Sequence, residues 1–190
     1  MGAEIPRTVR LNNGVVMPVL GLGVWAMREG AETENAVRWA LEAGYSLFDT
    51  AKLYGNEQSV GRAIRASGVA RGEIFVTTKI WPTNFFNPQT AFERSFAKLD
   101  IGYIDLFLIH FPVDFIPGFG ILRRRAWQVL EKEHARGRVR AIGVSNYSIA
   151  RVNEALATGR VPPAINQVKF NPFAYKRELL QLCKANNIVV

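Results

Sequence analysis

The chain has 190 residues, of which 48% are hydrophobic and 21% charged, and this is ordinary for one globular domain with a sizeable core. Its net charge of +8 comes from scattered basic residues with one dense cluster, Arg123-Arg124-Arg125, and no nucleic-acid-binding motif accompanies them, so we expect no nucleic-acid partner. The single Cys183 excludes a disulfide within the chain. Neither a signal-peptide pattern nor a run of about 20 apolar residues occurs. We therefore expect a cytoplasmic protein with no membrane segment.

The first predicted element is a hairpin. Residues 8–11 and 15–19 are apolar runs that flank Asn12-Asn13-Gly14, and Asn-Gly between two such runs is a strong hairpin signal. Residues 19–22 then predict a strand.

After the hairpin, helical patterns and short apolar runs alternate to the last residue. Helical periodicity occurs over residues 32–43, 57–66, 88–99, 126–135, 149–157 and 176–185, with apolar runs near Ser46, Ile74, Ile104, Val139, Ile165 and Ile188. Asn87-Pro88 is typical of a helix start, and Gly44, Gly68 and Gly137 are typical of helix ends. This repeat predicts a parallel sheet of seven strands, which is one short of an eight-stranded barrel. The chain is therefore a fragment, or another chain completes it, or the sheet is open.

Polar residues follow three of these apolar runs. Asp49 ends one run and Tyr54 follows in the same loop, Lys79 ends the next, and His110 ends the third. In a barrel of parallel strands these positions converge at one mouth, where such barrels do chemistry. We expect Lys79 to pair with Asp49 and its ammonium to lower the pKa of the Tyr54 phenol, which would make Tyr54 a general acid. Residues 111–121, which follow His110, are a candidate active-site loop.

Two other kinds of site fit the sequence less well. Gly21 to Ala26 matches the dinucleotide pattern G-x-G-x-x-A, but residues 28–31 separate it from the next helix and Trp25 would crowd a pyrophosphate. A Rossmann dehydrogenase is therefore a minor alternative. With two histidines and one cysteine we expect no metal site, and Cys183 fits a buried structural thiol.

The ordered motifs resemble the aldo-keto reductases, most closely the short-loop bacterial and protozoal members. The resemblance rests on residues 49–57, Thr78-Lys79, residues 108–110, residues 143–146 and Asn166-Gln167. It implies a (β/α)8 TIM barrel with an N-terminal hairpin, here a single domain over residues 1–190 that is truncated before the eighth strand, with about six βα units and a seventh strand. It also implies NADPH-dependent reduction of an aldehyde or ketone, a small-molecule carbonyl substrate, to an alcohol. We expect the full-length protein to be a monomer.

The resemblance also assigns the site residues. Tyr54 would be the general acid, and Lys79, paired with Asp49, would adjust the pKa of Tyr54. His110 would orient the carbonyl. Those expected to bind NADP(H) are Gly23, Val24, Trp25, Asp49, Ser145, Asn146 and Gln167. Those expected to line the substrate pocket are Trp25, Tyr54, Trp81, His110 and Phe111.

Departures from the family pattern are Phe111, where Trp is common, and Lys169 and Asn171, where Glu and His are frequent. The rival interpretations are a non-catalytic barrel that senses the cofactor and an inactive fragment of a reductase. The sequence does not identify the aldehyde or ketone.

Overall fold

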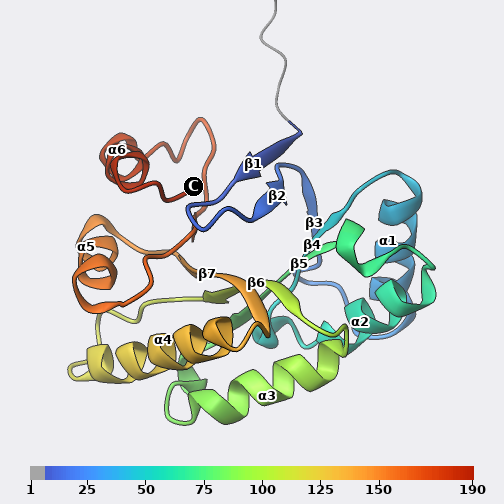
Figure 1. The fold of residues 1–190 in the computed structure, drawn as a ribbon, viewed down its shortest axis with the longest axis horizontal. Helices are drawn as coiled ribbons and strands as arrows, with labels where there is room; N and C mark the ends of the chain where they lie inside the picture. Colours follow the sequence, from blue (N-terminus) through green and yellow to red (C-terminus); the bar gives the residue numbers. More distant parts are fainter. Residues whose placement is uncertain (1–6) are drawn as a thin grey trace, which may run out of the picture.

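A curved parallel sheet with helices outside it forms the body of the molecule (Figure 1). The computed structural model describes residues 7–190. The six strands pair in chain order and are β3 (Gly21–Gly23), β4 (Leu47–Asp49), β5 (Phe75–Ile80), β6 (Ile104–Ile109), β7 (Val139–Ser145) and β8 (Asn166–Gln167). The helices are α1 (Ala31–Glu42), α2 (Glu57–Ala66), α3 (Pro88–Leu99), α4 (Phe119–Ala135), α5 (Ile149–Thr158) and α6 (Arg177–Ala185). This is the architecture of an incomplete (β/α)8 barrel, as predicted.

The sequential strand order also decides against the dinucleotide alternative. A Rossmann sheet reverses direction from a central strand, whereas each strand here lies beside its predecessor in the chain. The glycines of the G-x-G pattern lie in β3, and α1 begins only at Ala31. No helix start is therefore available beside Gly23 to receive a pyrophosphate.

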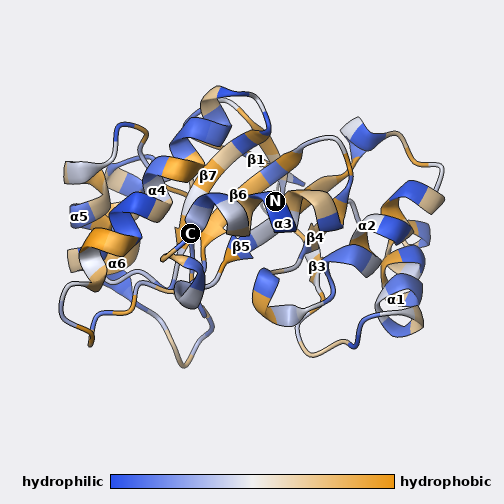
Figure 2. Cartoon of the chain, turned by 90° about the horizontal axis from the view of Figure 1, so that it is seen from below, coloured by the Kyte–Doolittle hydropathy of each residue, from blue (hydrophilic) through white to orange (hydrophobic). Residues whose placement is uncertain are grey.

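The two central strands are buried along their whole length. Every residue of β5 and β6 is buried, as expected for strands of a parallel sheet that are covered on both faces. Outside the sheet, Phe48, Phe92 and Phe107 belong to a large apolar cluster shared with the helices. Figure 2 shows hydrophobic residues along the central strands and hydrophilic residues on the outer surfaces of the helices.

The predicted hairpin covers one end of the sheet. It consists of β1 (Thr8–Arg10) and β2 (Val16–Pro18), which pair antiparallel. Leu11 in its turn is buried in the cluster on the inner face of the sheet. The side-chain amides of Asn12 and Asn13 donate hydrogen bonds to the carbonyls of Pro163 and Arg140, over 2.9 and 2.8 Å, and so fix the turn to the barrel.

Most of the predicted helix boundaries are correct to within one residue. Asn87 caps α3 through the Thr90 amide, and Pro88 is the first helical residue. The three helix-ending glycines, at positions 44, 68 and 137, all have positive φ. Cys183 is buried, as expected.

The predicted start of α4 at residue 126 was wrong. The helix begins at Phe119, and its buried stripe includes Arg123 and Glu133 beside Trp127 and Leu130. Arg123 is a charged residue in this buried stripe and interrupts the apolar pattern, so the sequence pattern does not extend the helix over its first two turns. The loop after His110 therefore ends at Gly118.

Two strand predictions also need correction. The strand predicted at residues 19–22 is β3, Gly21–Gly23, because these are the residues that pair with β4. The seventh strand is reduced to one parallel bridge between Ile165 and Val189. Within residues 7–190 the sheet stays open between β3 and Val189, and a hollow lies there. In the same part of the chain, no helix is long and apolar enough to cross a membrane.

Candidate active site

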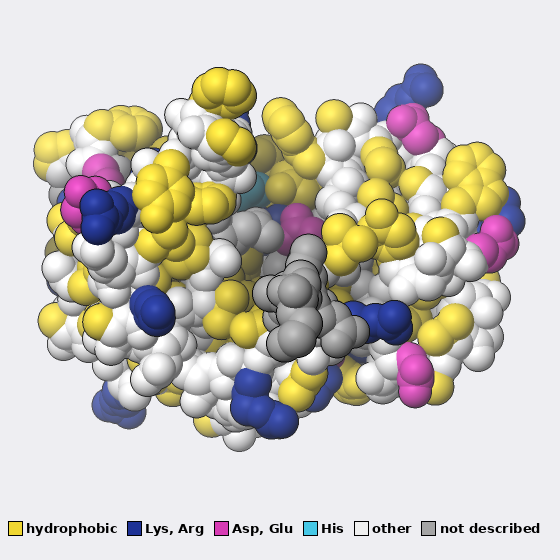
Figure 3. All heavy atoms as spheres, turned by 90° about the horizontal axis from the view of Figure 1, so that it is seen from above, with side chains coloured by type: hydrophobic (Ala, Val, Ile, Leu, Met, Phe, Trp, Pro, Cys, Tyr) yellow, Lys and Arg dark blue, Asp and Glu magenta, His cyan; other side chains and the backbone are white. Residues whose placement is uncertain are grey.

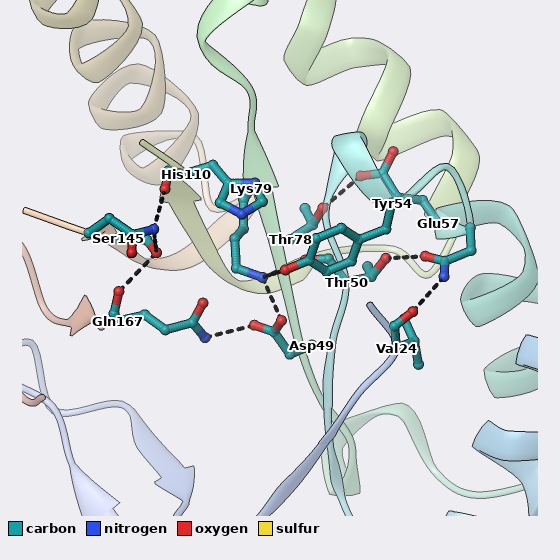
Figure 4. Close-up of polar contacts among 12 residues, drawn as sticks. Val24, Asp49, Thr50, Tyr54, Glu57, Thr78, Lys79, His110, Ser145 and Gln167 are labelled. Carbon is teal, nitrogen blue, oxygen red and sulfur yellow. Dashed lines mark hydrogen bonds and ion pairs between the residues drawn. The ribbon is translucent and has the colours of Figure 1, made fainter. Parts of the chain in front are cut away.

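The carboxyl ends of β4, β5 and β6 bring the four predicted catalytic side chains together (Figure 4). Asp49 is the last residue of β4, Lys79 lies near the end of β5, and His110 directly follows β6. Tyr54 ends the short 3-10 helix η1 (Lys52–Tyr54) in the loop after β4. Parallel pairing of the three strands is what makes these ends meet.

Lys79 is the centre of the group. Its side chain is 0% exposed, and its Nζ lies 2.5 Å from Oδ1 of Asp49. The same Nζ donates to the Thr50 carbonyl over 3.0 Å and to Oη of Tyr54 over 3.2 Å. An ammonium has three protons, so all three have an acceptor. Burial lowers the pKa of Lys79, and Asp49 opposes that shift.

The expected lowering of the Tyr54 pKa was wrong. Burial, and then the negative charge of Asp49, raise the pKa of Tyr54 to about 12. The phenol therefore keeps its proton at neutral pH, which is the state a proton donor needs. Since Lys79 can only donate, the Tyr54 proton must point away from it.

His110 is a neutral imidazole packed among aromatic rings. Its ring meets Tyr54 and Trp81 edge to face, with centroids 5.6 and 5.0 Å apart. Burial, and then the charge of Lys79, lower its pKa to about 4. A neutral imidazole can donate one hydrogen bond to a substrate oxygen without adding charge.

Three of the residues predicted to bind NADP(H) lie beside this group, at the ends of β7 and β8. Ser145 donates from its hydroxyl to the Gln167 carbonyl over 2.9 Å. The Asn146 side chain donates to the Ser145 hydroxyl and to the His110 carbonyl, each over 3.0 Å. The Gln167 amide reaches Oδ2 of Asp49 over 2.9 Å. Hydroxyl and amide groups thus adjoin the proton-donating group.

The loop after β3 contributes mainly through its backbone. Val24 has its side chain in the core, and its amide donates to the Asp49 carbonyl over 3.0 Å. Trp25 is 73% exposed and Phe111 38%, while Trp81 is half-buried against His110. In Figure 3, acidic and histidine side chains lie in a hollow that hydrophobic side chains flank.

Sequence reasoning missed the polar side chains that support this group. Asn56 is 0% exposed, accepts a hydrogen bond from the Thr50 hydroxyl over 2.8 Å, and donates to the Val24 and Met27 carbonyls. Glu57 accepts from the Thr78 hydroxyl over 2.6 Å, and burial raises its pKa. Their place directly after Tyr54-Gly55 was the available signal, since polar residues opening a helix beside a site often support it.

Chemically, the arrangement is a proton donor for an oxygen atom. A neutral phenol and a neutral imidazole flank a buried ammonium, and polar groups suited to a carboxamide lie alongside. Among residues 7–190, no group of three His, Cys, Asp or Glu side chains is placed to hold a metal ion.

Comparison with known proteins gives consistent matches. The model of the aldo/keto reductase family matches residues 19–190. The chain is 46% identical over 186 residues to 9,11-endoperoxide prostaglandin H2 reductase of Trypanosoma cruzi, covering 96% of the chain and 63% of that protein. It is 40% identical over 190 residues to glyoxal reductase of Bacillus subtilis, covering 99% of the chain and 67% of that protein. The structure of an aldo/keto reductase from Brucella melitensis superposes with a TM-score of 0.90 at 39% identity, covering 97% of this chain and 70% of that one.

Proposed function

Because the chain belongs to the aldo/keto reductase family, we propose that it reduces an aldehyde or ketone to an alcohol, with NADPH as the hydride donor and Tyr54 as the general acid. Members of this family use a nicotinamide cofactor, and the relatives named above are reductases. The chain spans about two thirds of the length of these relatives, and the activity of the whole protein is a proposal.

The observation that carries the proposal is the double contact of Lys79. One ammonium holds Asp49 at 2.5 Å and the Tyr54 oxygen at 3.2 Å, in a site that also presents His110. A protein that only binds a cofactor has no use for a buried ammonium on a phenol oxygen. This contact therefore favours the reductase over the cofactor-sensing barrel.

The donor set of the cleft suits a nicotinamide. Ser145, Asn146 and Gln167 offer a hydroxyl and two amides, which are uncharged groups that complement a carboxamide. We propose that they would bind this part of the cofactor, and that the backbone at Gly23, Val24 and Trp25 would also contact the cofactor. Bound NADPH supplies the hydride that reaches the carbonyl carbon.

Proton delivery is the task of the chain's own residues. As the carbonyl oxygen gains negative charge, the His110 imidazole donates a hydrogen bond to it and Tyr54 transfers its proton to it. An alkoxide is a stronger base than a phenolate, so this transfer is downhill even from a phenol with a pKa of about 12. The phenolate that remains lies 3.2 Å from the Lys79 ammonium, which stabilises it until it regains a proton.

The test is consumption of NADPH in the presence of small aldehydes, glyoxal among them, and of ketones. We expect turnover with NADPH. Binding of NADPH without turnover of any substrate in the panel would overturn the proposal and favour the cofactor-sensing barrel. The single domain truncated before an eighth strand, the monomeric state, the cytoplasmic location and the absence of a nucleic-acid partner stay predictions.

A further inference from the structure

The loop between His110 and α4 contains a strained residue. Val113 has a φ of +54° and is 6% exposed. A β-branched residue rarely adopts this left-handed conformation, because its side chain crowds the backbone. Such a residue persists only where its surroundings hold it in place. The loop must therefore be fixed by contacts on both sides of Val113.

The first contact comes from Arg123, in the second turn of α4. Its side chain is 6% exposed, and its Nη1 donates to the Pro112 carbonyl over 2.6 Å. Its Nη2 donates to both carboxylate oxygens of Glu154 on α5, over 2.8 and 2.6 Å. The guanidinium thus joins the loop to α5 in one planar fork.

The second contact lies on the other side of Val113. The Asp114 carboxylate is 2.6 Å from Nε of Arg151 and 3.8 Å from Nη1 of Arg123. Arg151 in turn pairs with Glu154. Burial opposes ionisation of Glu154, but hydrogen bonds from Arg123 and Arg151 outweigh it and lower the pKa of that carboxyl. Two arginines and two carboxylates balance in charge and hold Pro112 and Asp114 in place.

Packing of α4 on α5 does not by itself call for these charges. Apolar side chains of similar volume pack two helices as well as a buried ion pair or better. An apolar residue at position 123 could not donate the hydrogen bond to the Pro112 carbonyl. That bond acts on the loop, and the loop begins with Phe111, which directly follows His110.

We propose that Arg123, supported by Glu154, is a positioning residue that sets the conformation of residues 111–114 and thereby the substrate side of the site. His110 itself is held independently, because its amide donates to the Ile80 carbonyl and its carbonyl accepts from Asn146. Loss of the fork should therefore move Phe111 and leave the proton-donating group in place. The role in substrate specificity rests on the proposed function, whereas the fixing of the loop does not.

Hydrogen exchange followed by mass spectrometry tests the fixing of the loop without any substrate. A hydrogen bond to a charged group contributes about 1.5–3 kcal/mol, so Arg123→Gln should speed exchange at residues 111–118 by about tenfold or more. Arg125→Gln is the matched control, because that side chain is exposed on the same helix. Unchanged exchange in the loop would overturn the proposal, as would loosening spread evenly over α4 and α5. If Arg123→Gln does not fold, Arg123→Lys takes the place of the Gln variant in the comparison, because it keeps the charge and loses the planar fork.

Kinetics test the role in specificity. For a bulky aromatic aldehyde, Arg123→Gln should raise KM by about tenfold with kcat nearly unchanged, which is the pattern of lost substrate positioning. NADPH affinity should match that of Arg125→Gln. An unchanged KM despite a loosened loop would overturn the specificity role. Absence of turnover in the unaltered protein would count against the proposed function, and the exchange result would still decide whether Arg123 fixes the loop.

Discussion

The Gln167 amide donates a hydrogen bond from Nε2 to Oδ2 of Asp49, 2.9 Å away, while Lys79 occupies Oδ1 of the same carboxylate. Gln167 lies on β8 and Asp49 on β4, so the bond crosses the curved sheet. Asp49 is therefore shared by the residues proposed to bind the cofactor and by those proposed to deliver the proton. A change at Gln167 should therefore affect both the residues proposed to bind the cofactor and those proposed to deliver the proton.

Gln167→Leu removes this bond without adding charge. The free energy of unfolding should fall by about 1.5–3 kcal/mol, the usual contribution of a hydrogen bond to a charged group. The free energy of unfolding should fall further in Gln167→Glu, because this change places a second carboxylate against Asp49. Denaturant titration measures both, and NADPH titration should show weaker binding in both. Equal stability of the Leu and Glu variants would mean that residue 167 does not face Asp49.

Tyr54→Phe keeps the ring and removes the proton. General acid catalysis contributes typically about 10²–10⁴-fold, so kcat for carbonyl reduction should fall by that order while NADPH binding stays nearly intact. Tyr103→Phe is a suitable control, because Tyr103 stacks on Arg71 ahead of β6, away from the mouth. A drop in kcat of less than about threefold in Tyr54→Phe would remove Tyr54 from the proposed role.

The positions of Asp49, Lys79 and His110 could be predicted because each follows an apolar run. Once such runs are read as parallel strands, geometry alone places their ends together. The Gln167 to Asp49 bond could not be predicted in this way, because it depends on how far the sheet curves. The pKa of Tyr54 could not be predicted from the sequence either, since it depends on how deeply the phenol is buried and on the nearby charge of Asp49.

Arg123 shows a second limit of pattern analysis. A cluster of three arginines is normally a solvated surface, and here two of the three side chains are exposed. The third lies in the buried stripe of α4, where its partners on the loop and on α5 compensate its charge. Hydrophobic periodicity treats such a residue as an interruption. The same misreading shortened the predicted helix and hid the contact that fixes the loop.

Lys79→Met should destabilise the fold as well as abolish activity. Lys79 is 0% exposed and Asp49 15%, and removing one member of a buried pair costs about 3–5 kcal/mol because the other charge stays behind. Lys52→Met, at an exposed lysine in the same loop, is the control. The double variant Asp49→Asn/Lys79→Met should recover part of the stability and none of the turnover. An unchanged melting temperature in Lys79→Met would mean that the pair is solvated in solution.

His110 should make the fold sensitive to acid in a defined window. Its pKa in the folded chain is about 4, lowered first by burial and then by Lys79, against about 6.5 in the unfolded chain. Between these values the unfolded chain binds a proton that the folded chain does not, so stability falls as pH falls from 6.5 to 4 and is fully retained above 6.5. His110→Asn lacks this group. The unaltered protein should therefore lose stability relative to His110→Asn as pH falls through this window, and the difference should be constant above it.

Denaturant titrations at several pH values measure this difference. A stability difference between the unaltered protein and His110→Asn that does not vary below pH 6.5 would show that the imidazole is already solvated in the folded state, and the neutral hydrogen-bond donor proposed for the carbonyl would then be lost.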